Sequence, residues 1–332
     1  GSFEFTTASA VEATSLAVTD AQTYTITAVG GSDTLKSFSG TVTLDATDTD
    51  TVTVKTGAND TPLEIDGAFA ADNATSLTVT TSHTDSHITF GGTTMITADL
   101  LETLTVSAGG GGSTADDSDI TVGAIGATAA AAALSTITIT AADGADVTMG
   151  AIDAEGGSLT SITASANTTG SVITFGTIGL ITSNITSIGE INLTAVSGAT
   201  VDLAGHVYAT TIGTITASGA GTINMDATAS AITTIEQFNA GSASGTVSVD
   251  YTAASVAITA TMGTGTNTYV AGYGGDVVTL ASGDGTDIVE FTANAAAEEV
   301  VTIHNFTSAT DKIRFDSSDI QVSAAFDGVA GT

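Results

Sequence analysis

Cysteine and tryptophan are absent from the 332 residues, and proline occurs once, at Pro62. Without cysteine no disulfide framework can form, so the fold must be stabilised by a buried core or by bound metal. Basic side chains are also scarce, because four Lys and Arg stand against 36 Asp and Glu, which gives a net charge of −32. Since phosphate binding requires basic side chains that displace counterions, we exclude a nucleic-acid partner.

Long hydrophobic segments are missing too. The most apolar run, residues 127–134, is mostly alanine and is much shorter than the ~20 residues that a transmembrane helix needs, so we expect no transmembrane segment. A basic N-terminal region typical of a signal peptide is also missing, and we expect the sequence to be a fragment of a longer secreted protein. The scarcity of lysine and the abundance of Asp, Thr, Gly and Ala suit an extracellular, calcium-rich setting.

What the chain does contain is a repeat. Residues 101–108 (LETLTVSA) and 134–141 (LSTITITA) share the pattern h-x-x-h-x-h-x-A, in which h is apolar, and related segments start at residues 159, 188, 212 and 232. A second short alternating segment follows each copy. Alternation with period 2 and β-branched residues predicts strands, and short strands repeating every ~25 residues are typical of a β-solenoid, whose stacked coils share one core.

The expected fold is therefore all-β, with a parallel β-solenoid (β-helix) as its body. In residues 1–100 the repeat is faint, so irregular solenoid coils and a β-sandwich are both open for that region. Residues 101–260 carry the clear solenoid repeats. We assign residues 261–332 to a short calcium-binding β-roll with a capping tail, because of the motif that they contain.

This motif consists of three nine-residue units, 262–270, 271–279 and 282–290. Each unit has glycine at its second and fourth positions, Asn or Asp at the sixth and an apolar residue at the eighth, which is the pattern of the calcium-binding β-roll. Ca²⁺ prefers six to eight oxygen ligands, which backbone carbonyls and the sixth side chain can supply between stacked turns. The predicted ligand set is Gly263, Gly265, Asn267, Gly272, Gly274, Asp276, Gly283, Asp284, Gly285 and Asp287. Asn267 stands where the pattern has aspartate, so the first unit should bind more weakly.

Together with the segment that follows, the three units resemble the RTX (repeat-in-toxin) family, which is exported by type I secretion. Residues 300–315 (VVTIHNFTSATDKIRF) are similar to the hTIxxFxxxxDKIxF segment that commonly follows RTX repeats. The rest of the chain resembles, in composition and style of repeat, the body of RTX-type surface-layer (S-layer) proteins. The resemblance implies bound Ca²⁺ and an extracellular location on a bacterial cell surface.

On these grounds we expect a structural subunit of a calcium-dependent surface lattice, which self-assembles through divalent-cation bridges. Cell-surface polysaccharide or lipopolysaccharide, reached through calcium, is a second expected partner. The alternative is an extracellular adhesin or matrix module of the RTX class, although such a module more often has an aromatic ligand platform, and only 5% of this chain is aromatic.

An enzyme ranks third, and we expect none. Polysaccharide lyases built on β-helices use a basic residue in the groove, but Lys36, Lys55, Lys312 and Arg314 all lie outside residues 56–311. Two acidic loops, Asp45 to Asp50 and Asp116 to Asp119, could bind Ca²⁺ or could be solvated turns, and the sequence leaves both open. His83 and His87 are four residues apart, but in a strand-and-turn segment they need not share a face, so a zinc site is not predicted.

Overall fold

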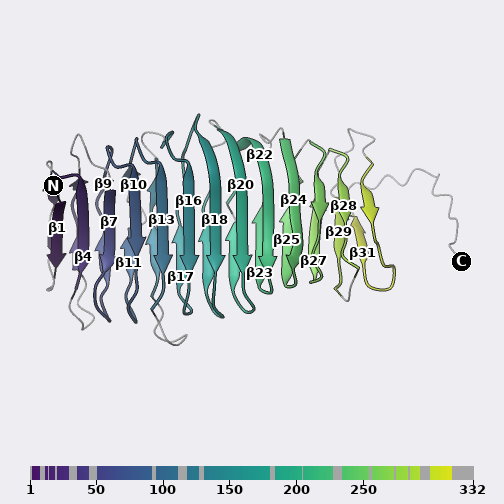
Figure 1. The fold of residues 1–332 in the computed structure, drawn as a ribbon, viewed down its shortest axis with the longest axis horizontal. Helices are drawn as coiled ribbons and strands as arrows, with labels where there is room; N and C mark the ends of the chain where they lie inside the picture. Colours follow the sequence, from purple (N-terminus) through teal and green to yellow (C-terminus); the bar gives the residue numbers. More distant parts are fainter. Residues whose placement is uncertain are drawn as a thin grey trace, which may run out of the picture.

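The chain forms one continuous stack of coils in which every strand pair of the described residues is parallel (Figure 1). The structure is a computed structural model, and it describes residues 2–7, 12–13, 15–18, 21–29, 36–44, 51–91, 95–110, 118–126, 131–179, 184–203, 205–226, 234–252, 254, 256–272, 274–282, 285–291 and 300–315. Two long sheets and one short sheet, here called A, B and C, form the sides of the stack.

Sheet A has 13 strands, which are β1 (Ser2–Thr7), β4 (Thr23–Ala28), β7 (Thr51–Thr56), β10 (Ser76–Thr80), β13 (Thr103–Ala108), β16 (Thr136–Ala141), β18 (Ser158–Ala166), β20 (Ile185–Ala195), β22 (Ala209–Gly219), β24 (Thr234–Ala243), β26 (Thr259–Thr261), β28 (Val277–Thr279) and β30 (Thr302–His304). Sheet C has five, which are β3 (Leu16–Val18), β6 (Val42–Leu44), β9 (Phe69–Ala70), β12 (Met95–Thr97) and β15 (Ala124–Ile125).

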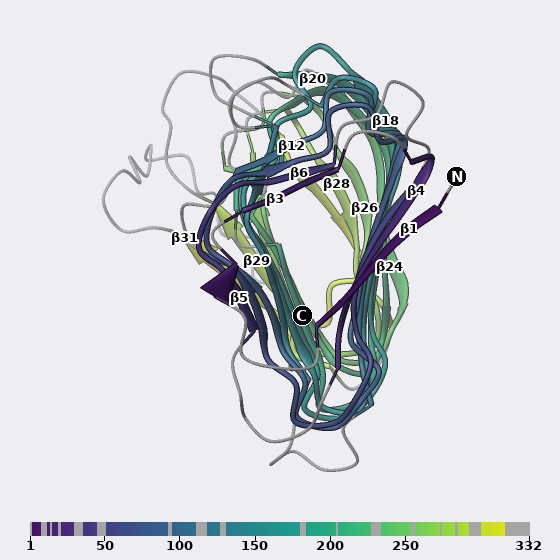
Figure 2. The same ribbon diagram turned by 90° about the vertical axis from the view of Figure 1, so that its left-hand side faces the viewer.

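Sheet B also has 13 strands, which are β2 (Glu12–Ala13), β5 (Lys36–Phe38), β8 (Leu63–Ile65), β11 (Ile88–Phe90), β14 (Ile120–Val122), β17 (Asp146–Met149), β19 (Val172–Phe175), β21 (Thr200–Leu203), β23 (Thr222–Asp226), β25 (Thr246–Asp250), β27 (Asn267–Ala271), β29 (Ile288–Phe291) and β31 (Lys312–Phe315). Each coil runs through sheet A, turns into sheet B and returns along the third side of the stack, as the end-on view shows (Figure 2).

The core is a set of columns of apolar side chains that repeat from coil to coil. In sheet A, for example, Val79 stacks on Val106, and Val106 stacks on Ile139, and all three are fully buried. The alternation of the sequence produces this arrangement because successive side chains of a strand point to opposite faces of the sheet. Every second residue therefore enters the core, and the residues between them, mostly threonine, face outward.

The turns between sheets A and B repeat from coil to coil as well. Asp60, Asp85 and Asp143 adopt positive φ angles of 51°, 49° and 58° in these turns. Aspartate tolerates this left-handed conformation better than most residues with a side chain. The corner between the two long sheets is therefore both tight and acidic.

The predicted fold class is confirmed, because the described residues form an all-β, parallel solenoid and contain no helix. In particular, the part of the chain that the structure describes has no helix that could span a membrane. The strands of residues 2–100 belong to the same three sheets as the later strands, so they form solenoid coils and not a separate β-sandwich. The boundaries near residues 100 and 260 stay predictions.

Candidate metal centre in the last coils

One inward-facing position of sheet B changes from apolar to polar toward the C-terminus. From β8 to β25 this position is apolar in every coil, and the residues in register are Leu63, Ile88, Ile120, Val147, Ile173, Val201, Ile223 and Val247. The next three coils place Asn267, Asp287 and Asp311 in the same column, and all three are buried. Burying polar groups is costly unless they are paired, so this column requires hydrogen-bond partners or a cation.

The amide nitrogen of Asn267 lies among three oxygen atoms. Asn267 Nδ2 donates to the carbonyl oxygens of Gly263 at 2.8 Å and Gly265 at 3.1 Å, and to Asp287 Oδ1 at 2.8 Å. The same Asp287 oxygen also accepts a hydrogen bond from the backbone nitrogen of Asn267 at 3.2 Å. Four of the predicted ligand residues are therefore brought together around one point.

The other end of the same amide has no partner. Asn267 Oδ1 is buried and accepts no hydrogen bond from the described residues. Rotation of the amide about χ2 exchanges its two ends and directs Oδ1 toward the three oxygens. Four oxygen atoms so close together repel one another unless a cation lies among them. An all-oxygen donor set of carbonyls and a carboxylate is the chemistry that Ca²⁺ prefers, so these residues fit a calcium ion.

Asp311 extends the site beyond the predicted residues. Asp311 Oδ1 accepts a hydrogen bond from the backbone nitrogen of Asp287 at 3.3 Å, and its Oδ2 accepts one from Thr307 N at 2.7 Å. Burial, and secondarily the negative charge of Asp311, raise the pKa of the Asp287 carboxyl, while hydrogen bonds from Asn267 oppose the shift. Sequence reasoning missed Asp311 as a site residue. The signal was the Thr-Asp pair at 310–311, which repeats the pair at 286–287.

Asp276 is held differently. Its Oδ1 accepts a hydrogen bond from Ile258 N at 2.9 Å, and its Oδ2 accepts bonds from the Tyr269 hydroxyl at 2.9 Å and from Gly272 N at 3.3 Å. The carboxylate is fully buried, and burial raises its pKa against the effect of these three bonds. The structure therefore brings Gly272 to Asp276 but not to the cluster around Asn267. Gly274 lies in the same loop, and an added Cβ there would be 1.8 Å from the carbonyl carbon of Val256.

In the third unit, Gly283 and Asp284 lie outside the described residues. Gly285 is described, and it ends a column of glycines that begins well before the nonapeptides. A Cβ at Gly245, Gly265 or Gly285 would lie 1.9, 1.7 or 2.0 Å from the carbonyl oxygen of the glycine one coil earlier, the first of which is Gly221. The sequence signal is a Gly-Thr pair two residues before each inward position, at 221, 245, 265 and 285. The turns of the first and third nonapeptides are therefore continuous with the turns of the solenoid body.

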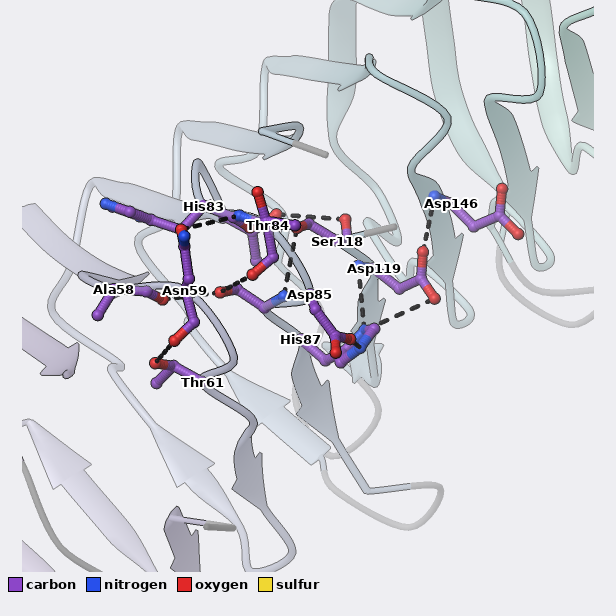
Figure 3. Close-up of polar contacts among 12 residues, drawn as sticks. Ala58, Asn59, Thr61, His83, Thr84, Asp85, His87, Ser118, Asp119 and Asp146 are labelled. Carbon is purple, nitrogen blue, oxygen red and sulfur yellow. Dashed lines mark hydrogen bonds and ion pairs between the residues drawn. The ribbon is translucent and has the colours of Figure 1, made fainter. Parts of the chain in front are cut away.

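Two further candidates from the sequence, His83 and His87, lie at the corner between sheets A and B (Figure 3). His87 Nε2 is 2.9 Å from Asp85 Oδ1, and its Nδ1 is 3.6 Å from Asp119 Oδ2. His83 instead contacts the hydroxyl of Ser82 at 3.1 Å, so the two histidines have different partners. No group of three His, Cys, Asp or Glu among the described residues is arranged to hold a metal ion.

The first acidic loop, with Asp45, Asp48 and Asp50, lies outside the described residues, as do Asp116 and Asp117 of the second. In that second loop the described aspartate is Asp119, whose Oδ1 accepts a hydrogen bond from Asp146 N at 2.9 Å.

Comparisons of the chain with protein-family models, with curated proteins and with solved structures found no match.

Proposed function

We propose that this protein is a structural subunit of a calcium-dependent surface lattice on the outside of a bacterial cell. The observation that carries the proposal is the Asn267 amide, whose nitrogen lies among three oxygens while its own oxygen is buried without a partner. Gly263, Gly265, Asn267 and Asp287 would hold a calcium ion at this point, and the ion would neutralise a carboxylate whose buried charge is otherwise unfavourable.

The shape of the molecule supports a structural role. Two parallel sheets of 13 strands, with a spacing of ~4.8 Å between strands, give a rod about 58 Å long. Because each coil contacts only its neighbours, such a rod extends without a change in architecture. The location at the bacterial surface and the type I secretion route rest on the resemblance of the nonapeptides and their tail to RTX proteins.

Charge supports a role for divalent ions in assembly. A net charge of −32 makes two copies repel each other, and with four basic residues few salt bridges can form between them. Divalent ions that bind carboxylates from both copies remove this repulsion. The same bridging would connect the lattice to anionic polysaccharide or lipopolysaccharide on the cell.

A calcium titration tests the proposal. Light scattering and electron microscopy should show ordered assemblies in Ca²⁺ and monomers after chelation, whereas NaCl of equal ionic strength should not replace Ca²⁺, because screening is not binding. Isothermal calorimetry on Asp287→Asn should show weaker Ca²⁺ binding than on Glu190→Gln, which removes an exposed carboxylate far from the site. If NaCl acts as Ca²⁺ does, bridging is refuted. If Ca²⁺ binds but no assembly forms, the adhesin or matrix-module function takes its place.

A further inference from the structure

The outward face of sheet A carries an unbroken column of threonines. Its members occupy one register position in six successive strands, and they are Thr25, Thr53, Thr78, Thr105, Thr138 and Thr163. Two residues earlier on each strand, a second column consists only of hydroxyl side chains, which are Thr23, Thr51, Ser76, Thr103, Thr136 and Ser161. We call this surface, on β4, β7, β10, β13, β16 and β18, the threonine face.

The threonine face is almost free of charge on a strongly acidic protein. None of the 36 Asp and Glu lies in its six strands, and Lys55 is their one charged residue. Acidic residues lie instead beside the face, at Asp85 and Asp143 in the corner toward sheet B and at Glu102 just before β13. The outward face of sheet B is not neutral in the same way, because strands β8, β17 and β21 each contain a carboxylate.

No described strand covers this face. In the end-on view, sheet A forms one side of the stack, with sheets B and C on its inner side (Figure 2). The hydroxyl side chains of both columns are partly exposed, including Thr105 and Thr138 at the centre. An open, flat and regular sheet face of this kind is suited to packing against a second flat surface.

We propose that the threonine face docks onto the threonine face of a second copy of this chain. This inference rests on the proposed function, and it specifies which surface makes the contact between subunits. Two polyanions approach most readily where neither carries a negative charge. Within the described strands of sheet A, the longest run without a carboxylate is this one.

The size of the face is adequate for a specific contact. Six strands at ~4.8 Å and five residues at ~3.3 Å give a flat area of about 480 Å². Side-chain relief increases the accessible area above this flat value, toward the ~800 Å² that each partner buries in a standard interface. Facing rows of Thr and Ser interdigitate well in such sheet-to-sheet contacts.

The proposed docking would place bridging calcium at the rim of the contact. When two threonine faces meet, the acidic corners that flank them come close together at the rim of the contact. Carboxylates such as Asp85 and Asp143 from both copies then repel one another unless divalent ions lie between them. A centre without carboxylates and an acidic rim would explain why association requires Ca²⁺ although the contact itself contains no carboxylate.

A pair of matched double variants tests the surface. Thr105→Glu/Thr138→Glu places two adjacent carboxylates on the threonine face, and Thr121→Glu/Thr148→Glu places the same two charges on adjacent outward positions of sheet B. By analytical ultracentrifugation, we expect the first variant to need at least tenfold more Ca²⁺ to associate and the second to behave as the wild type. Circular dichroism must show that both variants are folded.

Cross-linking provides a second measurement, because the chain has no cysteine of its own. A short bismaleimide should link Thr138→Cys into dimers in Ca²⁺ but leave Thr148→Cys, on sheet B, monomeric. If wild type and both double variants assemble equally, the proposed function stands and the threonine face is wrong. If Ca²⁺ assembles neither the wild type nor the double variants, the proposed function is wrong. The threonine face as a contact between copies is then still supported if Thr138→Cys cross-links in concentrated NaCl and Thr148→Cys does not.

Two further outcomes would overturn the inference. Equal cross-linking of both cysteine variants, or none under any condition, removes the threonine face as the contact. Regular hydroxyl arrays can also order water, so ice is the other occupant to consider. If the wild type stays monomeric and shapes ice crystals, and if Thr105→Glu/Thr138→Glu abolishes this activity, the threonine face binds ice and not a second copy.

Discussion

Two neighbouring tyrosines in the C-terminal coils offer a sharp test of the buried polar cluster. Tyr251 and Tyr269 are both buried, and their ring centroids lie 5.6 Å apart. The Tyr269 hydroxyl donates to Asp276 Oδ2 at 2.9 Å, whereas the Tyr251 hydroxyl is buried without a hydrogen-bond partner among the described residues. Burial raises the pKa of both hydroxyls, so both stay protonated at neutral and acidic pH. The same substitution, Tyr to Phe, should therefore have opposite effects at the two positions.

The magnitudes follow from the two environments. Tyr269→Phe removes a bond to a buried carboxylate and should lower the free energy of unfolding by about 1.5–3 kcal/mol, the usual range for hydrogen bonds to charged groups. Tyr251→Phe removes a buried hydroxyl that makes no bond, so it should be neutral or should stabilise the protein by about 1 kcal/mol. The free energies of unfolding of the two variants should then differ by about 1.5–4 kcal/mol in calcium-free buffer.

Urea unfolding in EDTA measures this difference. The chain has five Tyr and no Trp, so tyrosine fluorescence can follow the transition, and a change of midpoint at constant m value reports stability alone. Since solenoid coils can unfold from one end, circular dichroism should follow the whole sheet in parallel. Equal losses in both variants, or a larger loss in Tyr251→Phe, would refute the assignment of Tyr269 as the partner of Asp276.

Two further predictions concern pH and packing. Burial raises the pKa of Asp276 and Asp287 above 3.8, so the calcium-free folded protein takes up these protons before the unfolded chain does. In EDTA the urea midpoint should therefore rise as pH falls from neutral through the raised pKa values. The rise should be smaller in Asp287→Asn, and a midpoint that falls with pH would contradict the prediction. In Ca²⁺, acidification should instead lower the urea midpoint, because Ca²⁺ binds the ionised carboxylates. At Gly213 an added Cβ would lie 2.2 Å from the Gly189 carbonyl oxygen, so Gly213→Ala should lower the free energy of unfolding by about 1–3 kcal/mol. At Gly109 the nearest atom to an added Cβ is 3.6 Å away, so Gly109→Ala should lower it clearly less. Equal losses in the two variants would argue against the close approach at Gly213.

The solenoid could be predicted from the sequence because the pattern and the structure share one period. In residues 101–108 and 134–141 the apolar positions coincide, and the structure pairs Leu104 with Ile137 and Val106 with Ile139 in one register. Since a shift of one residue would turn every apolar side chain outward, the pattern itself determines which residues stack. The parallel arrangement follows because each coil repeats the one before it.

Sheet C and the continuity of the first hundred residues were harder to predict. The strands of sheet C are two or three residues long, for example Phe69–Ala70, and so short a segment cannot show alternation. After β15, this side of the stack continues through isolated bridges that connect Ile125, Ile152, Ile178 and Val207. A single apolar residue in each coil is enough to hold this side, but it leaves no periodic signal in the sequence.

The candidate site was predicted only in part, because the nonapeptide pattern describes a single turn. The pattern specifies the turn and its sixth residue, which identified Gly263, Gly265, Asn267 and Asp287. It contains no information about the coil stacked on that turn. Asp311 enters the cluster only because the tail adds another coil, which continues the pairing of β29 with β31.

The inward column of sheet B shows how this fold uses polar residues in its core. Among the described residues of this column Lys36 is the first, paired with Leu63, and it is as deeply buried as the apolar residues that follow. Asn267, Asp287 and Asp311 end it, so polar side chains occur near the two ends of the stack and apolar ones occupy its middle. Each of these polar residues stands where a coil in the middle of the stack has an apolar side chain, so the coils that carry them gain less from core burial than the middle coils do. A calcium ion at the C-terminal end would then provide by coordination the stability that the missing apolar contacts do not.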